Sequence, residues 1–259
     1  MEASLTVDAV RQAWGRIQPH IRRTPLLRTE RLDPRLGCEV HLKPEMLQVT
    51  GSFKARGALS KALLLSPEER DRGLIASSSG NHAQALAYAG GLIGARTTLV
   101  MPHDAPKVKV DRTRALGGGG LLSGIAAAVK GIAPKVRVGG VEPALAPKYH
   151  VSRSQGRPTK VPAGPSIADG VREELTGANA YGFIERWVDD LVVVEERYIR
   201  EGLRLLAEEA KLFAEGAAAV GIGAALSGQL PLTPAARACF VLTGGNWDVE
   251  RLLSALNQI

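Results

Sequence analysis

Apolar positions along the chain alternate between short runs and longer segments, and this alternation predicts an α/β fold. Runs typical of buried strands occur at 39–43, 74–77, 97–102, 136–143, 189–194 and 240–243. The segments between them predict helices over 7–21, 55–65, 83–95, 108–116 and 125–130, and a long amphipathic helix through 199–210. Strands that alternate with helices in this way favour open, mostly parallel sheets with helices on both faces. The residues at 148–165 are rich in Ser, Arg, Gly, Lys and Pro and predict a surface loop.

The composition argues against a nucleic-acid-binding protein and a membrane-spanning protein. The chain has 259 residues, 45% of them hydrophobic, and a formal net charge of +7. Its basic residues are spread among acidic neighbours, as at 68–72 (EERDR), and only 4% of residues are aromatic, so a nucleic-acid surface is not expected. Cys38 and Cys239 show no metal-ligand or disulfide spacing, and no stretch approaches the roughly 20 apolar residues of a membrane span. These features predict a cytoplasmic protein that contacts neither membrane nor nucleic acid.

One lysine lies in a setting that a surface lysine does not need. Lys54 stands in the stretch 50–58 (TGSFKARGA), between a turn of small residues and an Ala-rich amphipathic segment. A partly desolvated lysine gives up its proton more readily than one in water, and the neutral amine can form a Schiff base with an aldehyde. Lys54 is therefore a candidate nucleophile, although most lysines are solvated charges.

Two further stretches predict anion sites. The strand at 74–77 runs into 78–82 (SSGNH) and a helix, which is a geometry that presents free backbone N–H groups to a carboxylate or phosphate. The glycines at 117–120 precede another helix and indicate either a flexible linker or a phosphate loop. The apolar helix that follows at once favours the phosphate loop. Thr243 brings a hydroxyl to the end of the last strand, where open parallel sheets bind ligands.

Taken together, these motifs make the chain similar to the serine/threonine dehydratase and serine racemase family. These are pyridoxal-phosphate enzymes with the tryptophan-synthase-β type of fold. The resemblance covers nearly the whole chain, in the family's order, through the stretches 43–54 (KPEMLQVTGSFK), 78–84 (SSGNHAQ), 101–107, 117–124, 140–143 (GVEP), 166–170 (SIADG), 215–217 (EGA) and 243–246 (TGGN). It implies a two-domain enzyme of fold type II, with a large cofactor-binding domain at 1–52 and 117–259 and a truncated small domain at 53–116.

The resemblance also implies roles for single residues. Lys54 would hold pyridoxal 5'-phosphate and then act as base, and Ser79 would transfer protons on the opposite face. The cofactor-binding residues would be Phe53, Lys54, Asn81, Gly117, Gly118, Gly119, Gly120, Leu121, Glu215 and Thr243. Without the family, Ser79 could equally be a helix N-cap, Glu215 a solvated helix residue and Thr243 a plain strand end.

The chain departs from the family in two places. Near residue 117 the end of one motif is fused to the start of the next, so that more than one βαβ unit of about 30 residues is missing. This predicts an internally deleted relative with a damaged cofactor site. Glu142 is present, but Lys148 stands where family members that bind a divalent ion carry an acidic residue. Either the ion is absent or the ammonium substitutes for its charge, and in both cases no metal and no dependence on magnesium or calcium are expected.

The resulting functional hypothesis is a pyridoxal-phosphate lyase that converts L-threonine or L-serine to a 2-oxo acid and ammonia. A racemase remains open, because both reactions use the same two flanking groups. The third alternative is an inactive remnant of such an enzyme. The partner expected is a small amino-acid substrate, and the resemblance to dimeric enzymes leaves a homodimer possible.

Overall fold

The computed structural model describes residues 5–78, 80–100 and 119–257, and the strands within them form three small groups. β2 (Glu39–Pro44) lies between β1 (Leu27–Arg28), which is antiparallel to it, and β7 (Arg237–Leu242), which is parallel. β3 (Leu74–Ser77) pairs in parallel with β4 (Thr97–Val100), and β5 (Gly139–Pro143) pairs in parallel with β6 (Asp190–Val194). The predicted α/β class with mostly parallel pairing is confirmed.

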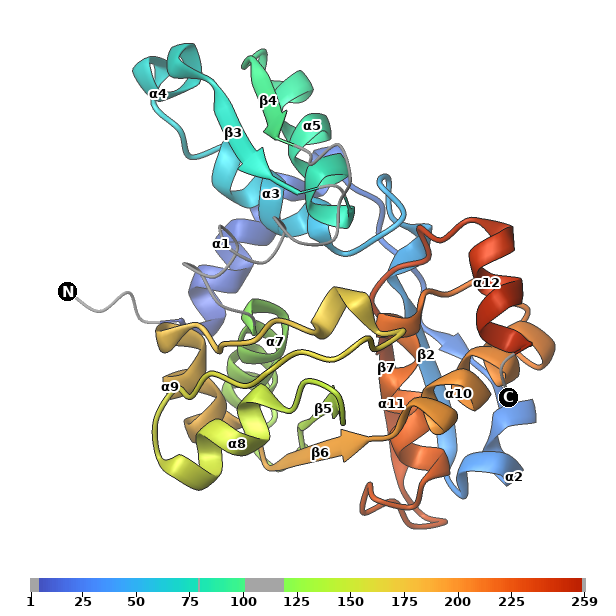
Figure 1. Cartoon of the computed structure of the whole chain (residues 1–259). Helices are drawn as coiled ribbons and strands as arrows, with labels where there is room; N and C mark the ends of the chain where they lie inside the picture. The colour runs from blue at the N-terminus through green and yellow to red at the C-terminus, as the bar shows by residue number, and fades with distance from the viewer. Residues whose placement is uncertain (1–4, 79, 101–118, 258–259) are drawn as a thin grey trace.

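Helices surround these strands (Figure 1). The α-helices are α1 (Val7–Ile17), α2 (Asp33–Leu36), α3 (Lys54–Ala62), α4 (Pro67–Arg72), α5 (Asn81–Ile93), α7 (Gly120–Ile132), α8 (Lys148–Gln155), α9 (Ala178–Trp187), α10 (Glu196–Glu208), α11 (Gly216–Leu226) and α12 (Val249–Leu256). Short 3-10 turns are η1 (Gln18–His20), η2 (Glu30–Leu32), η3 (Glu45–Leu47) and η4 (Asp169–Val171). None of the helices in the described part of the chain is long and apolar enough to cross a membrane.

The main hydrophobic core lies between the β2–β7 pair and the helices α10 and α11. Alternate residues of β2 are buried, as the period of two in a strand requires, and Val40 and Leu42 are fully covered. α10 contributes a stripe at helical spacing that includes Ile199, Leu203 and Leu206. These elements give this half of the molecule its rigid frame.

The parallel strands of this half are divided into two pairs. Within the described residues, β7 pairs only with β2 and β5 only with β6, while α11 packs against strands of both pairs. Two strand pairs that share a covering helix but no hydrogen bonds are what the loss of an intervening strand would leave. The arrangement fits the internal deletion predicted near residue 117.

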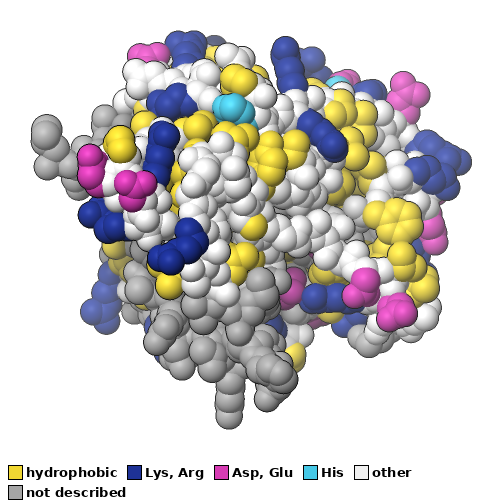
Figure 2. All heavy atoms as spheres, turned by 90° about the horizontal axis from the view of Figure 1, so that it is seen from above, with side chains coloured by type: hydrophobic (Ala, Val, Ile, Leu, Met, Phe, Trp, Pro, Cys, Tyr) yellow, Lys and Arg dark blue, Asp and Glu magenta, His cyan; other side chains and the backbone are white. Residues whose placement is uncertain are grey.

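A second, smaller region lies at the top of Figure 1 and contains α3, α4, α5 and the β3–β4 pair. Its core cluster joins Ala58, Leu59 and Ala85 to Ile17 of α1. On the outer face of β3, Ile75 is 73% exposed. Seen from above, the molecule shows hydrophobic side chains among scattered Lys and Arg side chains, with fewer Asp and Glu (Figure 2).

Several predicted boundaries need correction. The surface loop predicted for 148–165 is wrong in its first part, where α8 runs from Lys148 to Gln155. The Glu142 carboxylate accepts the backbone N–H groups of Tyr149 and His150, and this cap from a distant residue is invisible in the local composition. α7 begins at Gly120 instead of residue 125, and the strand predicted at 136–143 begins at Gly139. The helix predicted at 108–116 lies outside the described residues.

Candidate active site

The predicted lysine turn and the end of the last strand meet in space. The backbone N–H of Phe53 donates to the carbonyl of Thr243 at 3.0 Å, and that of Gly245 donates to the carbonyl of Gly51 at 3.1 Å. Lys54 is the first residue of α3, directly after Phe53, and its ammonium lies 5.0 Å from the centre of the Phe53 ring. The candidate nucleophile and the strand-end hydroxyl are thereby brought to one junction.

Two glycines make this junction possible. Gly51 has a positive φ of 67°, and a side chain there would meet Asn246 Oδ1 at 2.1 Å. A Cβ on Gly244 would lie 2.7 Å from Glu215 Oε1 and 3.1 Å from Asn81 Nδ2. The backbone therefore approaches its neighbours more closely than any other residue type allows.

A hydrogen-bond network joins the start of α5 to the start of α11. Asn81 Nδ2 donates to Glu215 Oε1 at 2.8 Å, and Asn246 Nδ2 donates to Asn81 Oδ1 at 2.7 Å and to the carbonyl of Thr50 at 2.9 Å. Glu215 is the N-cap residue of α11 and is only 5% exposed. The solvated-helix interpretation of Glu215 is therefore wrong, because its carboxylate is buried in this network.

The electrostatic setting of the network differs from that of an ion pair. Burial raises the pKa of Glu215, and the nearby Asp169 adds to the rise, while the hydrogen bonds from Asn81 and Asn246 oppose it. Burial also lowers the pKa of His82, the second residue of α5, and the charge of Lys54 lowers it further. Both pKa shifts run toward the neutral form of the group, and the Lys54 charge contributes to that of His82.

The junction has unmet hydrogen bonds that a bound group could satisfy. The hydroxyls of Thr50, Ser52 and Thr243 are buried and have no hydrogen-bond partner among the described residues. A buried hydroxyl without a partner costs free energy unless a ligand satisfies it. A lysine amine, an unsatisfied Thr243 hydroxyl and the Asn81 amide are groups that fit an aromatic aldehyde with a ring nitrogen and a ring hydroxyl, as in pyridoxal phosphate.

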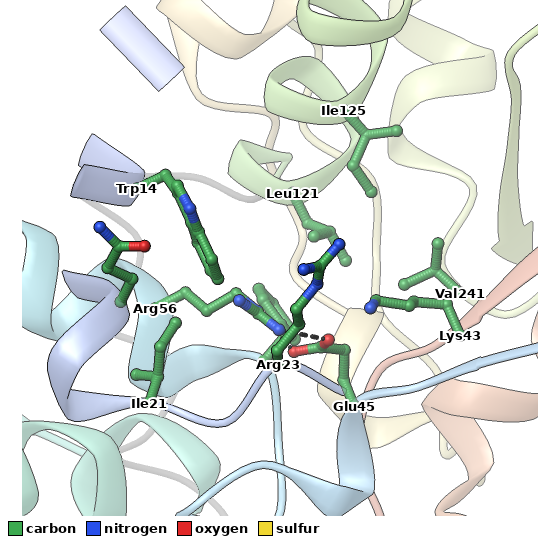
Figure 3. A pocket seen from close by; sticks show the side chains of 11 residues that line it. Trp14, Ile21, Arg23, Lys43, Glu45, Arg56, Leu121, Ile125 and Val241 are labelled. Atoms are coloured by element: carbon green, nitrogen blue, oxygen red, sulfur yellow. Dashed lines mark hydrogen bonds and ion pairs between the residues drawn. The ribbon is translucent and has the colours of Figure 1, made fainter. Parts of the chain in front are cut away.

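The described residues include the second half of the predicted phosphate loop. Gly117 and Gly118, like Ser79, lie outside the described residues. Gly119 has a φ of 111° and packs where a Cβ would meet Tyr149 and Ala180, which belong to α8 and α9. Gly120 begins α7, and the side chain of Leu121 lines a cavity of about 810 Å³ that Phe53 also lines (Figure 3).

Some residues at or near the site were not singled out from the sequence. Asn246 ties the network to the lysine turn, and its place in the TGGN stretch was the available signal. Glu45 is buried and paired with Arg56 through two hydrogen bonds of 2.7 and 2.8 Å, and it also accepts one from Thr24. Glu45 and Arg56 are 11 positions apart, and nothing in the sequence between them signals this pair.

The lysine that replaces an acidic residue is itself buried. Lys148 Nζ lies 3.2 Å from Glu173 Oε2 and 3.5 Å from Glu142 Oε1, and it donates to the carbonyl of Val171 at 2.8 Å. Of the two alternatives from the sequence, this geometry favours an ammonium that substitutes for a cation. In the described part of the chain, no group of three or more His, Cys, Asp or Glu residues could hold a metal ion.

Known proteins match this chain over nearly its whole length. The sequence model of the pyridoxal-phosphate dependent enzyme family matches residues 17–118 and 115–244. The L-threonine ammonia-lyase of Thermotoga maritima is 32% identical, with 98% of this chain and 79% of that protein covered. Among solved structures, a threonine deaminase from T.th. is 36% identical with a TM-score of 0.82, covering 94% of this chain and 98% of that one. Maize serine racemase is 26% identical with a TM-score of 0.87, covering 98% and 97%.

These matches also locate the missing segment. The two parts matched to the family meet at 115–118. The alignment with the Thermotoga protein spans 317 positions, although 98% of 259 residues is about 254, so roughly 60 positions have no counterpart in this chain. The fold, the family match and the junction agree: the chain belongs to the pyridoxal-phosphate dependent enzyme family, whose model matches it in two parts that overlap at 115–118.

Proposed function

We propose that this chain is a pyridoxal-phosphate-dependent ammonia-lyase that converts L-threonine or L-serine to a 2-oxo acid and ammonia. The single observation that carries the proposal is the junction of Lys54 with the partnerless hydroxyl of Thr243, close to the Asn81–Glu215 pair. The names of the relatives, which include threonine ammonia-lyase and threonine deaminase, support the same reaction.

In this proposal, the residues of the junction divide the work between binding and proton transfer. The cofactor, when bound, supplies an electron sink for the pair of electrons left at the substrate Cα. Lys54 Nζ would hold the cofactor through its aldehyde and would then be the base for the α-proton of the substrate. The Thr243 hydroxyl would be the partner of the ring nitrogen, and a neutral hydroxyl there would stabilise less charge than a carboxylate, which favours loss of the β-hydroxyl.

The remaining groups orient the cofactor and the substrate. Asn81 would bind the ring hydroxyl and is itself held by Glu215 and Asn246. Phe53 would pack beside the ring, and the glycine loop with Leu121 would hold the phosphate at the start of α7, where the helix dipole favours an anion. Ser79 is proposed to transfer a proton on the face opposite Lys54.

Racemisation is the second candidate, because maize serine racemase has a TM-score of 0.87 to this chain. The two reactions share α-proton removal and differ in whether the β-hydroxyl leaves. Product analysis separates them, since a racemase yields D-serine and a lyase yields pyruvate and ammonia from serine.

The first experiment is an absorbance scan of the purified chain with pyridoxal phosphate, repeated with Lys54→Ala. The proposal predicts a Schiff-base band that is lost in Lys54→Ala but retained in Lys61→Ala, a matched control on the exposed side of α3. Turnover of L-threonine and L-serine is then measured by release of the 2-oxo acid.

The outcomes separate an enzyme from a remnant. A lysine-dependent band together with 2-oxo acid release supports the lyase. A folded protein without such a band contradicts the proposal and indicates that the motifs are inherited without a working cofactor site.

We further propose the domain division implied by the family, with 53–116 as a truncated small domain between 1–52 and 117–259. The separate cluster around Leu59 supports it, although Ile17 of α1 packs into that cluster. Two free cysteines support a cytoplasmic location. A homodimer is proposed from the resemblance, and light scattering of the purified protein measures it.

A further inference from the structure

The cavity between the two regions is larger than a small amino acid requires. Its volume is about 810 Å³, within the range of roughly 300–1,000 Å³ typical of small-molecule sites. One wall comes from α1 and the segment after it, through Trp14 and Ile21, and the facing wall from α7, through Leu121 and Ile125 (Figure 3). The cavity therefore has apolar surfaces on two opposite sides.

The charged side chains that line the cavity carry a net positive charge. Arg56 and Glu45 neutralise each other through their paired hydrogen bonds. Arg23 has no hydrogen bond or ion pair to any residue that the structure describes, and Lys43 uses one of its three donors, to the carbonyl of Thr24 at 2.6 Å. Figure 3 shows the side chains of Arg23 and Lys43 reaching into the cavity, so two positive charges remain there without an anion.

The cavity adjoins the proposed cofactor site, because Phe53 and Leu121 line it. Lys54, Asn81, Glu215 and Thr243 do not line it. Leu121 lies shortly after residues 115–118, where the two parts matched to the family overlap.

We propose that this cavity binds an amphipathic organic anion, a carboxylate or sulfonate attached to an aromatic or branched apolar body. The anionic group pairs with Arg23 and Lys43, and the planar guanidinium of Arg23 can hold a carboxylate through two parallel hydrogen bonds. The apolar body packs between Trp14 and the α7 residues Leu121 and Ile125. A purely polar anion would leave the apolar walls exposed to water, and a neutral apolar molecule would leave Arg23 and Lys43 without an anionic partner.

The test uses 2-naphthoate as the probe and 2-naphthamide as its neutral isostere, titrated by calorimetry into the protein without cofactor. The wild type is expected to bind the carboxylate at least about tenfold more tightly than the amide, because a charge-assisted hydrogen bond contributes about 1.5–3 kcal/mol. Arg23→Gln should weaken 2-naphthoate by a similar factor and leave 2-naphthamide unchanged. Arg22→Gln is the matched control, because its neighbouring guanidinium donates to the carbonyl of Leu47 and does not line the cavity.

Two further variants locate the probe. Ile125→Trp should fill the cavity and abolish binding of the probe, and circular dichroism verifies that this variant is folded. If Ile125→Trp misfolds, Arg23→Gln still provides the test, because it alters only an exposed residue. Lys54→Ala should bind the probe as the wild type does, so this site can fail or hold independently of the proposed lyase. Equal affinity for acid and amide, or binding lost in Lys54→Ala and retained in Arg23→Gln, would overturn the proposal.

Discussion

The two regions of the molecule differ in how completely their strands are covered by helices and by neighbouring strands. In the larger region, β2 and β7 are covered by α10 and α11, and Leu42, Leu242 and Leu203 are almost or entirely inaccessible. In the smaller region, β3 and β4 pair with no other strand among the described residues, and Ile75 and Thr98 lie in register on the pair. A two-stranded sheet is marginal unless helices or further strands pack on it.

This difference between the two regions shows which strands are affected by the shortening of the chain. The family match is interrupted at 115–118, after β4 and before α7. The smaller region, which precedes this junction in the chain, has a sheet of two strands among the described residues, and the larger region has its main core but its parallel strands are divided into two pairs. The core next to the lysine turn is the better preserved of the two.

The largest expected effect compares one apolar residue from each region. Leu242→Ala should lower the free energy of unfolding by about 3 kcal/mol, because it empties a fully buried position of β7. Ile75→Ala should change it by about 0.5 kcal/mol or less, because that side chain is 73% exposed. Urea denaturation measures both. A loss at Ile75 as large as that at Leu242 would contradict the comparison and mean that the outer face of β3 is covered in solution.

A second prediction concerns the buried ammonium of the larger region. Lys148→Met should cost about 3 kcal/mol, because Glu142 and Glu173 would lose a buried cation at 3.5 and 3.2 Å. Lys160→Met is the matched control, since Lys160 pairs with Glu174 while 59% of its side chain is exposed, and it should cost about 1 kcal/mol or less. Thermal denaturation compares the two variants.

The same position tests the expectation of no metal dependence. With the Lys148 ammonium between the carboxylates, calorimetric titration of the wild type with magnesium or calcium chloride should show no tight binding. Tight binding to the wild type would mean that the ammonium does not substitute for a cation.

A third prediction compares glycines in the two regions. Gly223→Ala should destabilise by about 2 kcal/mol, because a Cβ there would lie 2.7 Å from the carbonyl oxygen of Tyr198 and would force α10 and α11 apart. Gly57→Ala in α3 should stabilise by about 0.5–1 kcal/mol, since nothing lies within 4 Å of its Cβ position and alanine is the better helix former. Destabilisation by both variants would show that α3 is packed more closely than this geometry indicates.

The local pattern of apolar and polar residues predicted the helices and strands but not the long-range contacts between them. The strand runs at 39–43 and 189–194 and the lysine turn predicted β2, β6 and the start of α3 closely, because each depends on neighbouring residues. α8 was missed because its cap is Glu142, and the Arg56–Glu45 pair was missed because nothing local predicts it. The division of the parallel strands follows from a missing segment, which sequence could reveal only through a family pattern.

The smallest expected effect is a difference in pH dependence between two buried carboxylates. Burial alone would raise the pKa of Glu45, but the hydrogen bonds from Arg56 and Thr24 outweigh it and lower that pKa. For Glu215 burial prevails and the pKa is raised. The contribution of Glu45 to stability is therefore fully present above the ordinary carboxyl pKa and is lost as pH falls through its lowered value. Glu215 acts in the opposite sense, because the folded state holds its proton more tightly, and stability falls as pH rises from the ordinary value through the raised one.

Gln substitutions separate these two behaviours. The destabilisation caused by Glu45→Gln should be greatest near neutral pH and should shrink on acidification, because the charged partner of Arg56 is then lost in the wild type as well. Relative to wild type, Glu215→Gln should gain stability as pH rises through the raised pKa, because the substitution removes the burial of a charge. The free energy of unfolding, measured by urea denaturation at several pH values, gives both slopes. Slopes of the same sign would mean that Glu215 has a cationic partner in solution and that the Asn81–Glu215–Asn246 network is organised around an ion pair.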